Sequence, residues 1–174
     1  DATIGQLEDC ATGIRDMDAA LGKLADYLQT CERPTILVFW GDHLNPMSDG
    51  FNLFTDTGFI EEGSSADPKM HETPLLIWSN YATTQVDPGI VAAYNLSPVA
   101  SELYGLDRPV FFDYLLQQLD TLRVRTRGIT VSPDGSYSEE LTDAQQESVL
   151  GHSILQYDYL FGDGVLESYT PKED

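Results

Sequence analysis

The first thirty residues place apolar side chains with the period of an α-helix. Five of them recur at steps of three and four: Ile14, Met17, Leu21, Leu24 and Leu28. Charged residues occupy the other positions, so the spacing predicts a helix over residues 4–30 with one buried face. Pro34 cannot continue a helix, and the segment 31–34 therefore ends it.

Two short segments are apolar at nearly every position, which is typical of strands buried on both faces. Residues 35–40 read Thr-Ile-Leu-Val-Phe-Trp, and residues 74–78 read Pro-Leu-Leu-Ile-Trp. Aromatic and branched side chains favour strands, and a continuous apolar run indicates a central place in a sheet. Residues 44–72 are rich in Gly, Asp, Ser and Pro, and we interpret them as a long functional loop with a short helix at 51–55.

Two more helices are predicted in the second half of the chain. Ser97 and Pro98 are the residue types preferred at the N-cap and the first helical position, so they predict a helix over 97–104. A second apolar segment predicts a helix over residues 110–122. Both helices follow the two strands in the sequence.

A hairpin and a last helix complete the predicted elements. The turn sequence Ser-Pro-Asp-Gly at 132–135 separates short extended pieces within residues 129–137. Thr142 and Gln145 have the spacing of a capping box, which opens a helix that ends near Phe161. Helices that alternate with strands over one domain-sized chain predict an α/β fold.

Composition and charge exclude several classes of protein. The 174 residues are 41% hydrophobic, and no run reaches the roughly 18 apolar residues of a membrane span. The net charge is −20, from 29 acidic and 9 basic residues. Such a charge repels nucleic acid and anionic lipid, so neither is an expected partner. It suits a solvated acidic surface, or carboxylates that gather a divalent cation.

The spacing of the two cysteines bears on disulfide formation, and the first residues bear on whether the chain is part of a longer protein. One helix between Cys10 and Cys31 would separate them by roughly 30 Å, too far for a disulfide, so we expect both to be free. The chain opens into a helical pattern without an initiator Met or a signal peptide. We therefore expect it to be a part of a longer protein.

The segment Gly41-Asp42-His43 carries the clearest candidate chemistry. It directly follows the first predicted strand, and strand ends in open α/β sheets are where ligands bind. A carboxylate and an imidazole at adjacent positions can reach one divalent ion, for which zinc and manganese are suitable. Gly41 permits a backbone turn there.

The other two histidines are weaker candidates. His71 precedes the second strand and is either a further contact at the same sheet edge or an exposed loop residue. His152 lies within the last predicted helix, where we expect a structural role. The chain contains no Gly-x-Ser-x-Gly elbow, no phosphate-binding glycine loop and no Cys-x-x-Cys.

Three segments together resemble the lipoteichoic acid synthase and phosphoglycerol transferase group of the sulfatase and alkaline phosphatase superfamily. They are residues 34–44 around Gly-Asp-His, residues 71–81 around the second strand, and residues 155–162. The resemblance implies that residues 1–174 are the C-terminal portion of an alkaline-phosphatase-like α/β/α sandwich with a mixed sheet. It also implies a bound manganese or zinc ion, with Asp42 and His43 as metal ligands.

In that group a threonine nucleophile and an acidic ligand precede the segment matched here, and this chain lacks both. We therefore expect the chain alone to be inactive. We assign His71 to substrate binding. The longer protein is expected to be a membrane-anchored enzyme at the extracellular face, acting on a lipid or glycan that bears phosphoglycerol. The alternatives are a sulfate ester hydrolase and a non-catalytic module that keeps the fold. Without its other half, we expect the sheet to self-associate.

Overall fold

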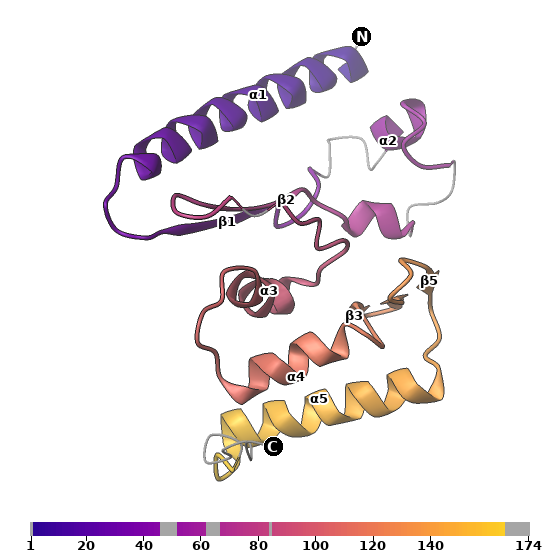
Figure 1. Cartoon of the computed structure of the whole chain (residues 1–174). Helices are drawn as coiled ribbons and strands as arrows, with labels where there is room; N and C mark the ends of the chain where they lie inside the picture. Colours follow the sequence, from indigo (N-terminus) through magenta and orange to yellow (C-terminus); the bar gives the residue numbers. More distant parts are fainter. Residues whose placement is uncertain (1, 46–51, 62–66, 84, 166–174) are drawn as a thin grey trace. The chain divides into compact units, whose positions relative to one another are not determined.

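The computed structural model describes residues 2–45, 52–61, 67–83 and 85–165 of the chain (Figure 1). Its helices and small antiparallel sheets are those of an α/β fold, as the sequence predicts. The chain divides into two compact units, Asp1–Thr83 and Thr84–Asp174. Each unit is described by itself below.

The first unit contains a long helix and a two-stranded sheet. Its elements are α1 (Ala2–Gln29), β1 (Ile36–Trp40), α2 (Asn52–Asp56), the 3₁₀ turn η1 (Pro68–His71) and β2 (Leu75–Ser79). The predicted helix over 4–30 and both predicted strands are therefore confirmed. The loop between them contains α2 and η1, and its residues 46–51 and 62–66 lie outside the described residues.

The strands β1 and β2 pair antiparallel along their full length. Ile36 faces Ser79 at one end of the ladder, and Trp40 faces Leu75 at the other. Within the described residues β1 and β2 are each other's sole strand partner, so each keeps one edge unpaired. The end at Trp40 is the one that leads into Gly41.

The helix α1 is attached to this sheet at its C-terminal end. The side-chain amide of Asn80 donates toward the carbonyls of Leu28, Cys31 and Arg33, at 2.9, 3.1 and 3.0 Å. Its oxygen accepts a hydrogen bond from the backbone N–H of Thr35 at 2.8 Å. Asn80 therefore joins the end of α1, the connection and the start of β1 to the end of β2.

The prediction of a buried face on α1 is wrong for this structure. Ile14, Met17 and Leu24 are 57%, 46% and 42% exposed. The hydrogen bonds between α1 and the sheet lie at its last turn, so they leave the apolar stripe open along the rest of the helix. Cys10 and Cys31 are free, as expected.

The second unit contains helices and a three-stranded sheet. Its elements are η2 (Ala93–Asn95), α3 (Leu96–Leu103), α4 (Val110–Gln118), β3 (Val124–Thr126), β4 (Ile129–Val131), β5 (Tyr137–Ser138) and α5 (Asp143–Phe161). The sheet is antiparallel in the order β3-β4-β5. Leu115, Leu122 and Val131 are almost fully buried and form part of its core.

Two predicted boundaries in this unit are wrong. Ser97 is not the N-cap of α3, because the turn η2 runs directly into the helix and Leu96 is already helical. The helix α4 ends at Gln118, since the N–H groups of Leu119 and Asp120 bond three residues back and tighten the last turn. The strand β3 that follows was not predicted.

The hairpin and the last helix are confirmed. In the turn, the N–H of Gly135 donates to the carbonyl of Ser132 at 2.9 Å, and Gly135 takes a positive φ of 82°. The hydroxyl of Thr142 accepts from the N–H of Gln145, and the Gln145 side chain accepts from the N–H of Thr142. This capping box begins α5, and Gly162 follows its last residue.

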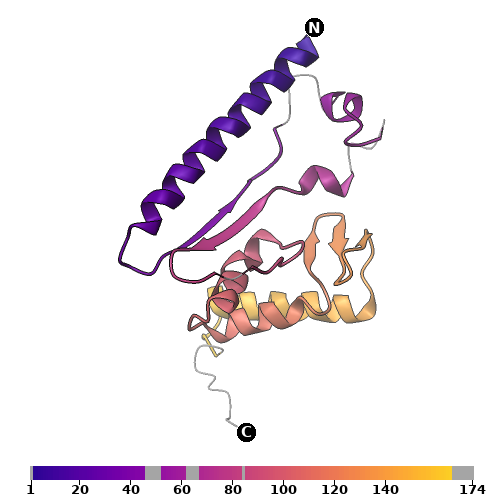
Figure 2. The same cartoon turned by 45° about the horizontal axis from the view of Figure 1, so that its top comes forward.

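The helices α4 and α5 lie side by side in both views (Figure 2). The hydroxyl of Tyr114 donates to the carbonyl of Ser148 at 2.8 Å. A Cβ atom at Gly151 would lie 2.3 Å from that hydroxyl oxygen, so the glycine makes room for the tyrosine. The contact between Tyr114 and Gly151 sets the distance between α4 and α5.

Candidate metal centre

Gly41 continues the β1–β2 ladder one residue beyond Trp40. Its N–H donates to the carbonyl of Pro74 at 3.3 Å, and its carbonyl accepts from the hydroxyl of Thr73 at 2.7 Å. A Cβ atom at position 41 would lie 2.8 Å from the Cβ atom of Thr73. The glycine is therefore required by close approach to Thr73, and not by the turn that its sequence context indicated.

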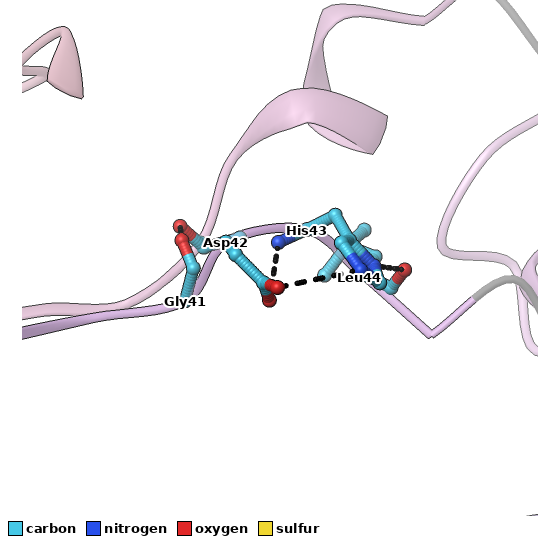
Figure 3. A network of polar contacts seen from close by, with 5 residues as sticks. Gly41, Asp42, His43 and Leu44 are labelled. Carbon is cyan, nitrogen blue, oxygen red and sulfur yellow. Dashed lines mark hydrogen bonds and ion pairs between the residues drawn. The ribbon is translucent and has the colours of Figure 1, made fainter.

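Asp42 and His43 extend from this anchored segment (Figure 3). One carboxylate oxygen of Asp42 accepts from the backbone N–H of His43 at 2.9 Å. The other lies 3.4 Å from Nε2 of His43, and the two side chains are 86% and 70% exposed. Both side chains are thus open to a ligand from solvent.

The ring of His43 is oriented by its second nitrogen. Nδ1 lies 2.9 Å from the carbonyl oxygen of Leu44, which can only accept a hydrogen bond. In the neutral ring this contact places the proton on Nδ1 and the lone pair on Nε2, the atom nearest the Asp42 carboxylate. Histidine ligands of metals commonly donate their other ring N–H to a carbonyl in this way.

The donor set therefore fits one side of a divalent metal site. A carboxylate oxygen and an imidazole nitrogen are suitable for zinc and for manganese. A zinc site ordinarily needs three protein ligands, however, and the described residues hold no group of three or more candidate ligands. Any further ligands have to come from residues other than Asp42 and His43.

His71 is the last residue of η1 and is exposed. It stands four residues before β2, and β2 begins opposite Trp40, so both segments lead to the same end of the ladder. The described residues nevertheless do not place it with Asp42 and His43 in a three-ligand group. Its predicted role in substrate binding stays a prediction.

His152 has the structural setting that its place in a helix indicated. Its Nδ1 lies 3.2 Å from the side-chain oxygen of Gln118. Its ring packs edge-on against Tyr94 and Phe111, with centroids 5.4 and 5.8 Å away. Burial lowers the pKa of His152 below its ordinary value, because it disfavours the charged ring.

Sequence reasoning missed how the candidate site is supported. Thr73 and Pro74 hold Gly41, yet they come 32 and more residues later in the chain. The antiparallel pairing of the two apolar strands, which was not predicted, brings them together.

Comparison with known proteins places this site within a family. Residues 1–106, which include β1, β2 and the Gly-Asp-His segment, match the sulfatase family. The chain belongs to the sulfatase family. No solved structure gives a significant match to this sulfatase-family chain.

A curated relative matches most of the chain. A "Putative cyclic beta-1,2-glucan modification protein" of Rhizobium meliloti is 28% identical over 165 residues, which covers 87% of the chain. The chain spans 25% of the length of that relative. In the part of the chain that the structure describes, no helix is long and apolar enough to cross a membrane.

Proposed function

We propose that the longer protein is a metal-dependent transferase that acts on phosphoglycerol esters, and that this chain supplies part of its metal site. The observation that supports the proposal is the Asp42–His43 pair at the end of β1, within the residues that match the sulfatase family. The sequence resemblance to the lipoteichoic acid synthase and phosphoglycerol transferase group supports the finer assignment.

Asp42 and His43 would hold the ion through a carboxylate oxygen and Nε2. A bound manganese or zinc ion supplies a Lewis acid that polarises the ester oxygen and lowers the pKa of the attacking group. Gly41, held by Thr73, fixes the backbone from which both ligands project. Leu44 orients the His43 ring through its carbonyl.

The nucleophile is expected on a segment that this chain does not contain. The family resemblance implies a threonine that forms a covalent phospho-enzyme, with an acidic ligand nearby. The chain by itself is therefore inactive in this proposal. The longer enzyme is membrane-anchored and works at the extracellular face.

The substrate is a phosphoglycerol ester carried by a lipid or a glycan. The name of the Rhizobium relative favours a glycan, and within that class a β-1,2-linked glucan as the acceptor. A sulfate ester hydrolase is the alternative within the family, since residues 1–106 match the sulfatase family as a whole.

The proposal is tested by Asp42→Ala in the longer protein. We expect loss of hydrolysis of bis(p-nitrophenyl) phosphate and, measured separately by elemental analysis, loss of bound manganese. The matched control is Asp26→Ala, which removes an exposed carboxylate from α1 and is expected to leave both unchanged. Wild-type turnover and metal content in Asp42→Ala would overturn the assignment.

The competing function is a non-catalytic module that keeps the fold, because fold alone does not establish activity. The sequence that precedes Asp1 in the longer protein separates the two. A threonine nucleophile and an acidic metal ligand there support the enzyme, and their absence supports the module.

A further inference from the structure

The strand β1 ends on an exposed tryptophan beside the candidate metal ligands. Trp40 is 48% exposed, whereas the four residues before it in β1 are only partly accessible. The exposed carboxylate of Asp42 and imidazole of His43 follow within three positions along the chain. An aromatic ring and two candidate ligands are therefore presented at one end of the ladder.

The backbone that carries Trp40 is fixed on both sides. Trp40 is paired with Leu75 in the ladder, and Gly41 is bonded to Thr73 and Pro74. The backbone at Trp40 and Gly41 is thus held by the hairpin, immediately before the ligand pair. Rigid placement of this kind is what a binding surface for a weakly held ligand requires.

We propose that Trp40 is a stacking platform for a pyranose ring of the glycan substrate, next to the Asp42–His43 pair. The inference rests on the proposed function, because it takes the glycan class of substrate from there. A β-linked glucose ring has a face of C–H groups that is apolar, and burying it against an indole ring removes apolar surface from water.

The arrangement also assigns separate tasks at the site. The ring would bind the sugar, and the ligand pair would act on the ester that the sugar carries or receives. A sugar on Trp40 would be held close to the metal ligands, because only Gly41 separates Trp40 from Asp42. The recognition of the acceptor and the chemistry would then lie within the four residues from Trp40 to His43.

Binding of a β-1,2-linked gluco-oligosaccharide to the 174-residue chain tests this inference. Saturation-transfer NMR is expected to show contact between the sugar C–H protons and the protein, without added metal. The chain has two tryptophans, so the Trp78→Phe variant leaves Trp40 as the only indole and should show fluorescence quenching by the same sugar.

Trp40→Ala is expected to weaken sugar binding about five- to tenfold, and Trp40→Phe should retain part of it. The matched control is Leu76→Ala, which removes another exposed apolar side chain of the hairpin, paired with Phe39. Circular dichroism of each variant checks that the fold is kept.

Equal binding by wild type and Trp40→Ala, or no binding by wild type, would overturn the inference. Either result would show that Trp40 does not bind the sugar. The proposed function fails differently, through retained turnover and metal in Asp42→Ala, so the two failures can be told apart.

Discussion

At the scale of single residues, the candidate site depends on contacts between distant positions. Gly41 has no room for a side chain because the Cβ atom of Thr73 would lie 2.8 Å from its own Cβ. The Asp42–His43 pair projects from this point, so any shift at Gly41 is passed to both ligands. Gly41 therefore links the packing of the hairpin to the chemistry of the site.

Gly41→Ala is expected to destabilise the chain by about 1–3 kcal/mol, because the added methyl group must push the two segments apart. Urea unfolding followed by circular dichroism measures the change. Gly22→Ala is the matched control. A Cβ atom there meets nothing within 4 Å, and alanine favours the interior of α1, so this variant should be slightly more stable. Unchanged stability of Gly41→Ala would contradict the close approach.

His152 predicts how stability depends on pH. Burial lowers its pKa in the folded chain, so the unfolded chain binds the proton more tightly. The stability that the buried neutral ring of His152 contributes is therefore fully present above the unfolded pKa of about 6.5. It is lost as the pH falls through the pKa of the folded chain.

The midpoint temperature of thermal unfolding should accordingly decrease as the pH is lowered from 7.5 to 5. His152→Gln should flatten part of this dependence, while His71→Gln, which alters an exposed histidine, should leave it as in wild type. Equal pH dependence in wild type and His152→Gln would exclude the buried ring as its source.

At the scale of elements, the side chain of Asn80 joins several parts of the first unit. It bonds to the end of α1, to the connection and to the start of β1. The carbonyl of Leu28 lies in the last turn of α1, where carbonyls lack an intrahelical partner, and those of Cys31 and Arg33 lie in the connection that follows. Asn80 is thus both a helix cap and a brace for the hairpin.

Asn80→Ala is expected to cost about 2–3 kcal/mol of stability. The N–H of Thr35 and the carbonyl of Cys31 lose their partner, and the carbonyls of Leu28 and Arg33 each lose one of two donors. Asn80→Asp should be at least as harmful, because a carboxylate cannot donate to the three carbonyls. Gln29→Ala serves as control, since its contact with the carbonyl of Asn80 is long, at 3.5 Å. Chemical denaturation that finds Asn80→Ala as stable as Gln29→Ala would refute the brace.

The elements differ in how far the sequence predicts them. Helix α1, strands β1 and β2 and the capping box of α5 were predictable, because each depends on a local period or a three-residue spacing. The start of α3, the end of α4 and the strand β3 were not, since each depends on turns or partners without a local pattern. At the site, the place of Asp42 and His43 directly after a strand was predictable, but the support from Thr73 was not.

At the scale of the whole molecule, apolar surface favours association between chains and net charge opposes it. The first unit leaves one edge of β1 and one edge of β2 unpaired within the described residues, and the stripe on α1 is exposed. A two-stranded sheet is marginally stable on its own, and open edges favour pairing with another chain. The net charge of −20 opposes such association.

We predict that the short-range attraction prevails and that the chain forms dimers or larger species at micromolar concentration in 0.15 M salt. Salt at that strength screens charges over about 8 Å, so repulsion between chains weakens while edge pairing does not. Sedimentation velocity should therefore show association that decreases as the salt is lowered.

Leu37→Lys places a charge in β1 and should favour the monomer. Ala19→Lys makes the same change in charge at an exposed position of α1 and should associate as wild type does. A compact monomer at every salt concentration would mean that the chain covers its own strand edges.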